Sequence, residues 1–359
     1  MIPSYKDCVD ICNKSDNFYQ KTLTIDGQKV DIFNYRLNSA KEFREHNAYE
    51  LRGITFVNET ECFPALNKFF NLGECDGWME EDLGDDFFVE DKLDGSMITF
   101  VKINGKYYAK TKNSFTNEQA KLAQEYFDAH PEYAEQHERF PHLQFIFELV
   151  GPSNKIVCDY PNNKLEGTQI RYKDNGEYTP LTDCPKKIEL VTLKEQVKTV
   201  ESIEGWILTN KQGKKFKLKT QWYLDRHGLV TETLVRENKI IELILNDRAD
   251  DALSILTKSD FRRVYCERLM IELTKYLKQS TEEVTAMLSN YNGDRKEFAL
   301  RYKEENLFGI AVTSLDNQDE DIILHKIKQM VLKRTKDLNK AKQFFNDELK
   351  FGEFIHVSE

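Results

Sequence analysis

The feature that most constrains this fold is a pair of alternating stretches joined by an Asn-Gly dipeptide. Residues 97–103 and 106–111 alternate apolar and polar side chains, with Asn104-Gly105 between them. Asn-Gly is favoured in the tightest hairpin turns because both residues tolerate a positive φ. A short apolar stretch at 87–90 precedes this pattern. The sequence therefore predicts a strand followed by a β-hairpin.

Lys92 lies in the connection between the predicted strand and the hairpin. The adjacent Asp94-Gly95 pair lets the backbone bend and approach a ligand closely. A lysine fixed there is either a surface charge or a nucleophile. Only the neutral amine attacks, so a nucleophilic role requires nearby cations and partial desolvation. This hypothesis predicts that other lysines converge on the same pocket.

Two basic runs supply lysines that could do so. KTK at residues 110–112 lies on the return strand of the hairpin. KKFKLK at 214–219 is a second alternating run, in which Lys217 and Lys219 share one face. The K-x-D-G match around Lys92 is weak by itself, because so short a motif often arises by chance.

Length and composition indicate a globular protein of two domains. The chain has 359 residues, 40% of them hydrophobic and 12% aromatic, which suffices for packed cores. Strand patterns and glycines largely disappear after about residue 240. We therefore expect an α+β fold: residues 1–240 form antiparallel sheets flanked by helices, and residues 241–359 form an all-α domain.

Several helices are expected in the second domain and one histidine-containing loop in the first. Helical patterns cover 260–279, 281–291, 294–306 and 319–350. The last begins acidic and turns basic, which suits either the helix dipole or a second surface for a polyanion.

His130, His137 and His142 have no standard metal spacing and are interpreted as loop histidines.

The sequence favours a soluble protein of a reducing compartment. No apolar run reaches membrane length, and the N-terminus lacks the features of a secretion signal. The seven cysteines are odd in number and contain no C-x-x-C pair. We expect a cytoplasmic monomer with no membrane partner. The net charge of −10 means that a polyanion must be bound by local basic patches.

Other residues each have a functional and a structural interpretation. Arg52 is either a ligand-binding side chain or an exposed arginine at a strand edge. Lys68 and Phe70 either bind phosphate and stack on a base, or contribute a solvated charge and a core ring. Glu148 interrupts the apolar strand 144–150, where a carboxylate is costly unless it is paired or faces a site. The acidic stretch 74–91 is interpreted as a solvated loop.

Seven motifs occur in an order that points to one family. They are LRG at 51–53, KFFNL at 68–72, KLDGS at 92–96, KTK at 110–112, FELVGP at 147–152, EGW at 204–206 and KLKTQWY at 217–223. This set resembles the covalent nucleotidyltransferases, specifically the ATP-dependent RNA ligase 1 family of tailed phages that repair cleaved tRNA. The resemblance covers roughly two-thirds of the chain. The helical C-terminal part favours this family over DNA ligases and capping enzymes, which carry a β-barrel there.

The resemblance implies that Lys92 attacks the α-phosphorus of ATP and becomes AMP-lysine. Mg²⁺ is the implied metal, with Mn²⁺ as an alternative. The other implied site residues are Lys217 and Lys219 at the α-phosphate, Arg52, Lys68 and Lys112 at the β- and γ-phosphates, Phe70 and Glu148 at the nucleoside, Glu204 and Glu148 at the metal through water, and Gly95 and Tyr223 within the nucleotide-binding motifs. Asn113 departs from the family, which often has glycine at this position.

The function implied is an ATP-dependent RNA ligase. It joins RNA 5′-phosphate and 3′-hydroxyl ends through lysyl-AMP and an adenylated RNA. The expected partner is broken tRNA, docked with help from the helical domain, in the cytoplasm of the host if a phage encodes the protein. Two alternatives remain open at this point: a GTP-dependent capping-type guanylyltransferase that uses the same lysine, and a catalytically silent RNA-binding protein on the same scaffold.

Overall fold

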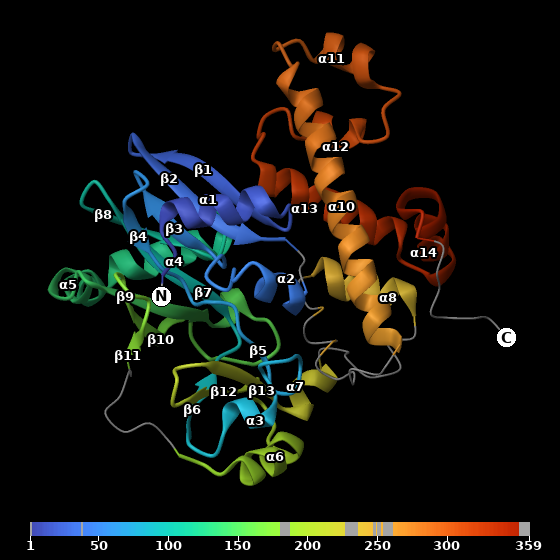
Figure 1. Ribbon diagram of the computed structural model, residues 1–359. Coiled ribbons are helices and arrows are strands. Elements are labelled where there is room, and N and C mark those ends of the chain that lie inside the picture. Colours follow the sequence, from blue (N-terminus) through green and yellow to red (C-terminus); the bar gives the residue numbers. More distant parts are fainter. Residues whose placement is uncertain are drawn as a thin grey trace. The chain divides into compact units, whose positions relative to one another are not determined.

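The computed structural model in Figure 1 describes residues 2–36, 39–179, 187–226, 236–246, 249, 253 and 261–351. The chain forms two compact units, Met1–Leu229 and Val230–Glu359. The described strands all belong to the first unit, and the described elements of the second are helices. The α+β class is thus confirmed. The border expected at 240/241 lies inside α8 (Glu237–Leu245), whereas the units divide before this helix.

The described residues of the first unit form three sheets. The first has the order β1-β2-β3-β4, with β1 (Phe18–Ile25), β2 (Gln28–Tyr35), β3 (Ile54–Val57) and β4 (Glu61–Phe63). The second has the order β11-β10-β9-β7-β8, with β7 (Ser96–Ile103), β8 (Lys106–Lys110), β9 (Leu143–Val150), β10 (Lys164–Tyr172) and β11 (Tyr178–Thr179). The third has the order β5-β13-β12-β6, with β5 (Phe70–Asn71), β6 (Phe87–Lys92), β12 (Gly205–Asn210) and β13 (Lys215–Lys219).

The hairpin that was predicted from the Asn-Gly pair is formed by β7 and β8. Ile103 pairs with Lys106, so the loop has two residues. Asn104 and Gly105 have φ values of 48° and 80°, as such a turn requires. The pairings between the strands that the structure describes are antiparallel, except that β5 and β13 run parallel. The expectation of antiparallel sheets therefore holds with this one exception.

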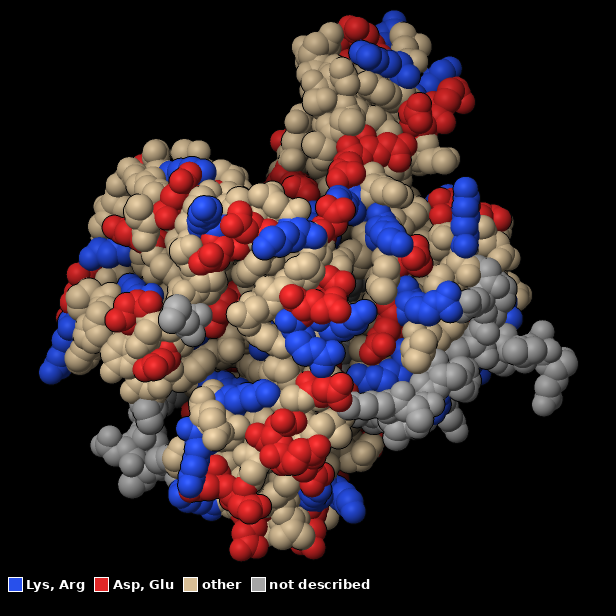
Figure 2. Space-filling view, viewed as in Figure 1, with Lys and Arg blue, Asp and Glu red and all other residues tan. Residues whose placement is uncertain are grey.

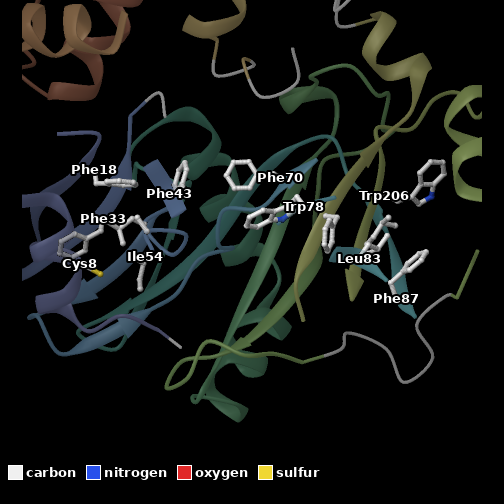
Figure 3. Packing of buried hydrophobic residues seen from close by; sticks show 14 of the residues in the cluster. Cys8, Phe18, Phe33, Phe43, Ile54, Phe70, Trp78, Leu83, Phe87 and Trp206 are labelled. Atoms are coloured by element: carbon white, nitrogen blue, oxygen red, sulfur yellow. The ribbon is translucent and has the colours of Figure 1, made fainter. Parts of the chain in front are cut away.

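Helices cover the sheets of the first unit. They are α1 (Tyr5–Lys14), α2 (Ala40–Glu45), α3 (Glu80–Leu83), α4 (Glu118–Ala129), α5 (Pro131–Arg139), the 3₁₀ turn η1 (Pro152–Asn154), α6 (Leu190–Thr199) and α7 (Gln221–Arg226). A buried aromatic cluster joins α1, α2 and the strands, and Figure 3 shows Phe18, Phe33, Phe43 and Trp78 within it. The Ser4 and Asn117 side chains cap α1 and α4 by accepting from backbone N–H groups.

The interpretation of the histidines as loop residues is wrong for His137. Pro131 begins α5 instead of a loop, because proline is well tolerated in the first turn of a helix. His137 lies on this helix with 4% of its surface exposed, and its Nδ1–H donates to the Tyr133 carbonyl at 2.7 Å. Its ring packs against Phe100 and Phe145, so it is a core side chain.

The acidic stretch 74–91 is only partly solvated. Glu74 is buried, and its Oε2 accepts hydrogen bonds from the backbone N (2.8 Å) and the side chain (2.7 Å) of Asn71. The second half of the stretch forms α3 and β6. The expectation of a solvated loop is therefore wrong at Glu74, whose buried carboxylate stabilises the turn that begins at Asn71.

The second unit differs from the expected helices at two points. It contains α8, α10 (Phe261–Ser289), α11 (Arg295–Tyr302), α12 (Phe308–Thr313), α13 (Glu320–Arg334), α14 (Leu338–Phe344) and a π turn (Phe345–Leu349). One helix, α10, replaces the two expected at 260–279 and 281–291, because the Thr281 hydroxyl donates to Leu277 within the helix instead of capping a new one. The helix expected over 319–350 ends at Arg334, and Asp337 caps α14.

No helix in the described part of the chain is both long enough and apolar enough to cross a membrane.

We predict that His137 makes the first unit less stable in acid. Burial lowers its pKa to about 4 from an ordinary value of 6.5. The unfolded chain binds the proton more tightly than the folded chain does. The free energy of unfolding therefore contains the full contribution of neutral His137 above pH 6.5, and it should fall by about 3 kcal/mol as the pH is lowered to 4. Urea unfolding at several pH values, followed by tryptophan fluorescence, measures this loss, since all three tryptophans lie in the first unit.

The His137→Phe variant should lack this part of the pH dependence. His142 is exposed, and His142→Phe is the matched control that should keep it. Parallel pH profiles for wild type and His137→Phe would contradict the assignment.

Candidate active site

Lys92 and Lys219 meet at one carboxylate, that of Glu204. Lys92 ends β6 and lies opposite Gly205 of β12, which in turn lies opposite Lys219 at the end of β13. Three strand ends are therefore in register, and Glu204 immediately precedes the middle strand. Its Oε1 lies 2.7 Å from Lys92 Nζ and 3.1 Å from Lys219 Nζ, and the side chain is 4% exposed. The structure thus brings together two of the lysines that the sequence singled out.

Lys217 lies two residues before Lys219 on the same face of β13. Its Nζ lies 5.4 Å from the centre of the Phe69 ring. Alternation along the strand explains why both lysines point to one side while Phe216 is buried on the other. A row of positive charge therefore extends along β13 away from Lys92.

Two glycines allow the close backbone approach that this site needs. A Cβ on Gly95 would lie 2.3 Å from the Leu149 carbonyl oxygen, and one on Gly205 would lie 2.1 Å from that of Leu218. Gly205 also has a φ of 148°. Neither position has space for a larger residue. The K-x-D-G loop consequently packs directly on β9.

Asp94 of that loop is a buried acceptor for three donors. Its Oδ1 accepts from the Tyr223 hydroxyl, and its Oδ2 accepts from the backbone N–H groups of Val157 and Cys158, all at 2.7 Å. Asp94 thus ties α7 and the segment after η1 to the loop that follows Lys92. Tyr223, which was expected within the nucleotide-binding motifs, is buried and positions Asp94 in this structure.

Glu148 belongs to the same electrostatic environment. The pKa of Glu148 is raised to about 7, chiefly by burial; Glu204 and Asp94 contribute to the rise, and Lys92 and Arg52 oppose it. Glu148 therefore lies within interaction range of all these charges. A carboxylate in an apolar strand is explained here by its position facing a charged site.

A divalent cation fits these two glutamates. The mutual repulsion of Glu148 and Glu204 is what a bound cation would offset. Within the described residues no group of three or more metal-binding side chains occurs. Water or phosphate oxygens would therefore complete the coordination, as is usual for Mg²⁺.

A second group of cations surrounds the ring of Tyr35. Lys112 Nζ lies 4.6 Å and Lys68 Nζ 5.7 Å from the centre of this ring. Lys68 is buried, contrary to the structural interpretation in which it was solvated. Sequence reasoning missed Tyr35, because it carries no charge and only alternation along β2 marks it.

Arg52 is not an exposed arginine at a strand edge. It lies in a turn before β3, where its Nη1 donates to the Leu66 carbonyl at 3.1 Å and lies 3.3 Å from Met97 Sδ. Met97 pairs with Glu148 across β7 and β9. Arg52 is thereby placed between the two groups of charged side chains.

Asn113 lies at the position where the family resemblance often implies glycine. It is not among the residues with positive φ, so the turn does not need glycine. Its Oδ1 accepts from Asn34 Nδ2 at 3.3 Å. This contact supports the position of Lys112.

Phe70 lies in the core and not in an open pocket. It is 2% exposed, and its ring centre lies 6.0 Å from that of Phe43 and 4.8 Å from that of Trp78 (Figure 3). The structural interpretation of this aromatic residue fits better than the expected contact with a nucleoside. Phe69 is also buried, under Lys217.

A cavity of about 650 Å³ opens beside the Lys68 end of the site. Its lining includes the basic side chains of Arg44, Lys68, Lys214 and Lys215, the acidic side chains of Glu50 and Asp76, and the aromatic rings of Tyr49, Phe69 and Trp78. Figure 2 shows acidic and basic side chains interspersed over the face in view. Local basic positions of this kind are what a polyanion would need on a chain of net charge −10.

Comparisons with known proteins find similarity to RNA ligases. A family model described as RNA ligase matches residues 50–188. A protein of Thermovibrio ammonificans named "Putative RNA ligase" is 29% identical over 293 residues, which are 74% of this chain and 76% of that protein. A "Putative bifunctional polynucleotide kinase/RNA ligase" of Autographa californica nuclear polyhedrosis virus is 25% identical over 284 residues, 68% of this chain and 40% of that protein.

Among solved structures, an archaeal ATP-dependent RNA ligase is 14% identical with a TM-score of 0.44, covering 84% of this chain and 86% of that one. The match of residues 50–188 to the RNA ligase family model agrees with the family resemblance noted in the sequence. This segment contains Lys92 and Glu148, whereas Glu204, Lys217 and Lys219 follow it.

We predict that Gly95→Ala disrupts the site. The added Cβ would meet the Leu149 carbonyl, and backbone cannot move aside cheaply, so the loop carrying Lys92 must shift from β9. The transfer of AMP from ATP to the protein that the sequence leads us to expect should fall by more than about tenfold, because small displacements at a reacting centre have effects of this size.

Gly309→Ala in α12 is the control, because a Cβ there meets nothing within 4 Å. It should retain the wild-type rate. A Gly95→Ala variant as fast as wild type would refute the close packing described here.

Proposed function

We propose that this protein is an ATP-dependent RNA ligase that joins RNA 5′-phosphate and 3′-hydroxyl ends through a lysyl-AMP intermediate. The observation that carries the proposal is the meeting of Lys92 and Lys219 at Glu204 Oε1, 2.7 and 3.1 Å away. A nucleophilic lysine beside a second cation and a buried carboxylate is suited to phosphoryl transfer. The match of residues 50–188 to the RNA ligase family supports it.

In the first step, the neutral amine of Lys92 attacks the α-phosphorus of ATP. The N–P bond forms as the bond to the β-phosphate oxygen breaks, and pyrophosphate leaves. Lys217 and Lys219 stabilise the negative charge that develops on the α-phosphate. Arg52, Lys68 and Lys112 orient the β- and γ-phosphates.

In the second step, an oxygen of the RNA 5′-phosphate attacks the phosphorus of lysyl-AMP, and the Lys92 amine leaves. In the third step, the 3′-hydroxyl of an RNA end attacks the 5′-phosphate of the adenylated RNA and AMP leaves. The natural substrate proposed from the family resemblance is broken tRNA, which the helical unit helps to dock. Glu148 contributes to placing the nucleoside, while Gly95 and Tyr223 keep the lysine loop in position.

A bound Mg²⁺ or Mn²⁺ ion would supply charge neutralisation at the phosphates. Glu204 and Glu148 are the residues proposed to hold it through water. The cysteines of the described residues are free, which fits the reducing environment of a cytoplasm. We propose that the protein acts there as a monomer.

A capping-type guanylyltransferase would use the same lysine with GTP. Separate incubations with α-labelled ATP and GTP discriminate between the two enzymes: the ligase takes label from ATP, and the guanylyltransferase from GTP. An RNA-binding protein without activity would take label from neither.

We predict that wild-type protein incubated with α-labelled ATP and Mg²⁺ acquires an acid-labile label that pyrophosphate removes. Lys92→Ala should acquire none, because the nucleophile is gone. Lys211→Ala is the control, since Lys211 is exposed and pairs with Asp86 away from the site. The same preparations are then tested for sealing of RNA with 5′-phosphate and 3′-hydroxyl ends. Labelling or sealing by Lys92→Ala would contradict the proposal.

We also predict that EDTA abolishes labelling without unfolding the protein. The described residues contain no cluster of three metal-binding side chains, so the fold does not depend on a structural metal of that kind. Circular dichroism and the melting temperature should be unchanged in EDTA, and labelling should return on addition of Mg²⁺ or Mn²⁺. Full labelling in EDTA would remove the metal from the proposal.

A further inference from the structure

Lys110, the first lysine of the KTK motif, is completely buried. It is 0% exposed at the end of β8, and its Nζ donates to the Gly53 carbonyl oxygen at 2.8 Å. Burial lowers the pKa of Lys110 to about 7, and no charged group in the described part of the chain is found to offset this shift. Burial of an amine costs free energy, and the hydrogen bond to Gly53 offsets part of this cost.

The residue that Lys110 contacts is held from several directions. The Gly53 carbonyl also accepts from Thr55 Oγ1 at 3.1 Å, and the Gly53 N–H donates to Phe33 at 2.9 Å. Gly53 has a φ of 96°, and a Cβ there would lie 2.5 Å from the Lys112 carbonyl oxygen. The backbone of Gly53 is therefore pressed against the backbone of Lys112.

This contact joins two side chains that the proposed function assigns to the same phosphates. Arg52 immediately precedes Gly53, and Lys112 follows Lys110 by two residues. The Lys112 carbonyl also accepts from Asn34 Nδ2 at 3.4 Å. Movement of Gly53 would consequently displace Arg52 and Lys112 relative to each other.

We propose that Lys110 is a positioning residue for the ATP-dependent step: by donating to Gly53 it fixes Arg52 and Lys112 at the spacing that holds the β- and γ-phosphates. The inference rests on the proposed function. It concerns only the reactions in which these phosphates take part, namely lysyl-AMP formation and its reversal by pyrophosphate. Sealing of RNA that is already adenylated involves neither phosphate and does not need this spacing.

The test is Lys110→Met, which keeps the length of the side chain and removes the donor. The ATP concentration at half-maximal lysyl-AMP formation should rise by up to about tenfold, because the hydrogen bond that fixes the spacing of Arg52 and Lys112 is lost and one hydrogen bond contributes a factor of about this size. The pyrophosphate concentration needed for reversal should rise likewise. The rate at which the same preparation seals pre-adenylated RNA should be unchanged, which also shows that the variant is folded.

Thr55→Val removes the other side-chain donor to the Gly53 carbonyl. It should raise the ATP concentration for half-maximal lysyl-AMP formation and the pyrophosphate concentration for reversal, but less than Lys110→Met does. Lys106→Met, which removes an exposed lysine from the same strand, is the control and should behave as wild type. Equal losses in lysyl-AMP formation and in sealing of pre-adenylated RNA would show a merely structural role and overturn the inference, as would an unchanged ATP dependence. A wild-type protein inactive in both reactions would instead overturn the proposed function itself.

Discussion

The carboxylate of Glu204 is the group on which the arrangement of the site depends. One of its oxygens, Oε1, forms salt bridges with both Lys92 and Lys219, although the side chain is almost completely buried. Removing charges from water is expensive, and only close pairing offsets the cost. The pairing is achieved by the register of β6, β12 and β13, which places Lys92, Gly205 and Lys219 side by side. Local strand geometry thus determines which lysines become neighbours, and a carboxylate in front of the middle strand makes this arrangement stable.

Buried polar side chains that touch no substrate in the proposed mechanism hold the charged ones in place. Asp94 connects the loop after Lys92 to α7 and to the segment after η1 by hydrogen bonds. The Gly53 carbonyl likewise connects the backbone next to Arg52 with the side chain of Lys110, two residues before Lys112. Apart from the contact between Asp94 and the Tyr223 hydroxyl, these hydrogen bonds have a backbone partner, so they fix the course of the chain as well as a side chain. A site that binds a polyanion must keep cations together against their repulsion, and these buried contacts explain how an otherwise acidic protein does so.

Periodicity and turn chemistry were enough to predict the hairpin, the α+β class and the shared face of Lys217 and Lys219, because these depend on residues close together in the chain. Burial depends on distant partners, and there the predictions failed. Phe70 could be a stacking ring or a core ring until its neighbours were known, and His137 becomes a core residue only when α5 packs on β9. The importance of Lys110 was hidden for the same reason: its partner is 57 residues away.

The central claim is that Lys92, which pairs with Glu204 beside Lys219, is the nucleophile that attacks ATP. Peptide mapping by mass spectrometry after incubation with ATP and Mg²⁺ tests it most directly. AMP should be found on the peptide that contains Lys92 and on no other, and the modification should disappear when pyrophosphate is added. AMP on a different lysine, or none on a protein that nevertheless seals RNA, would contradict the claim.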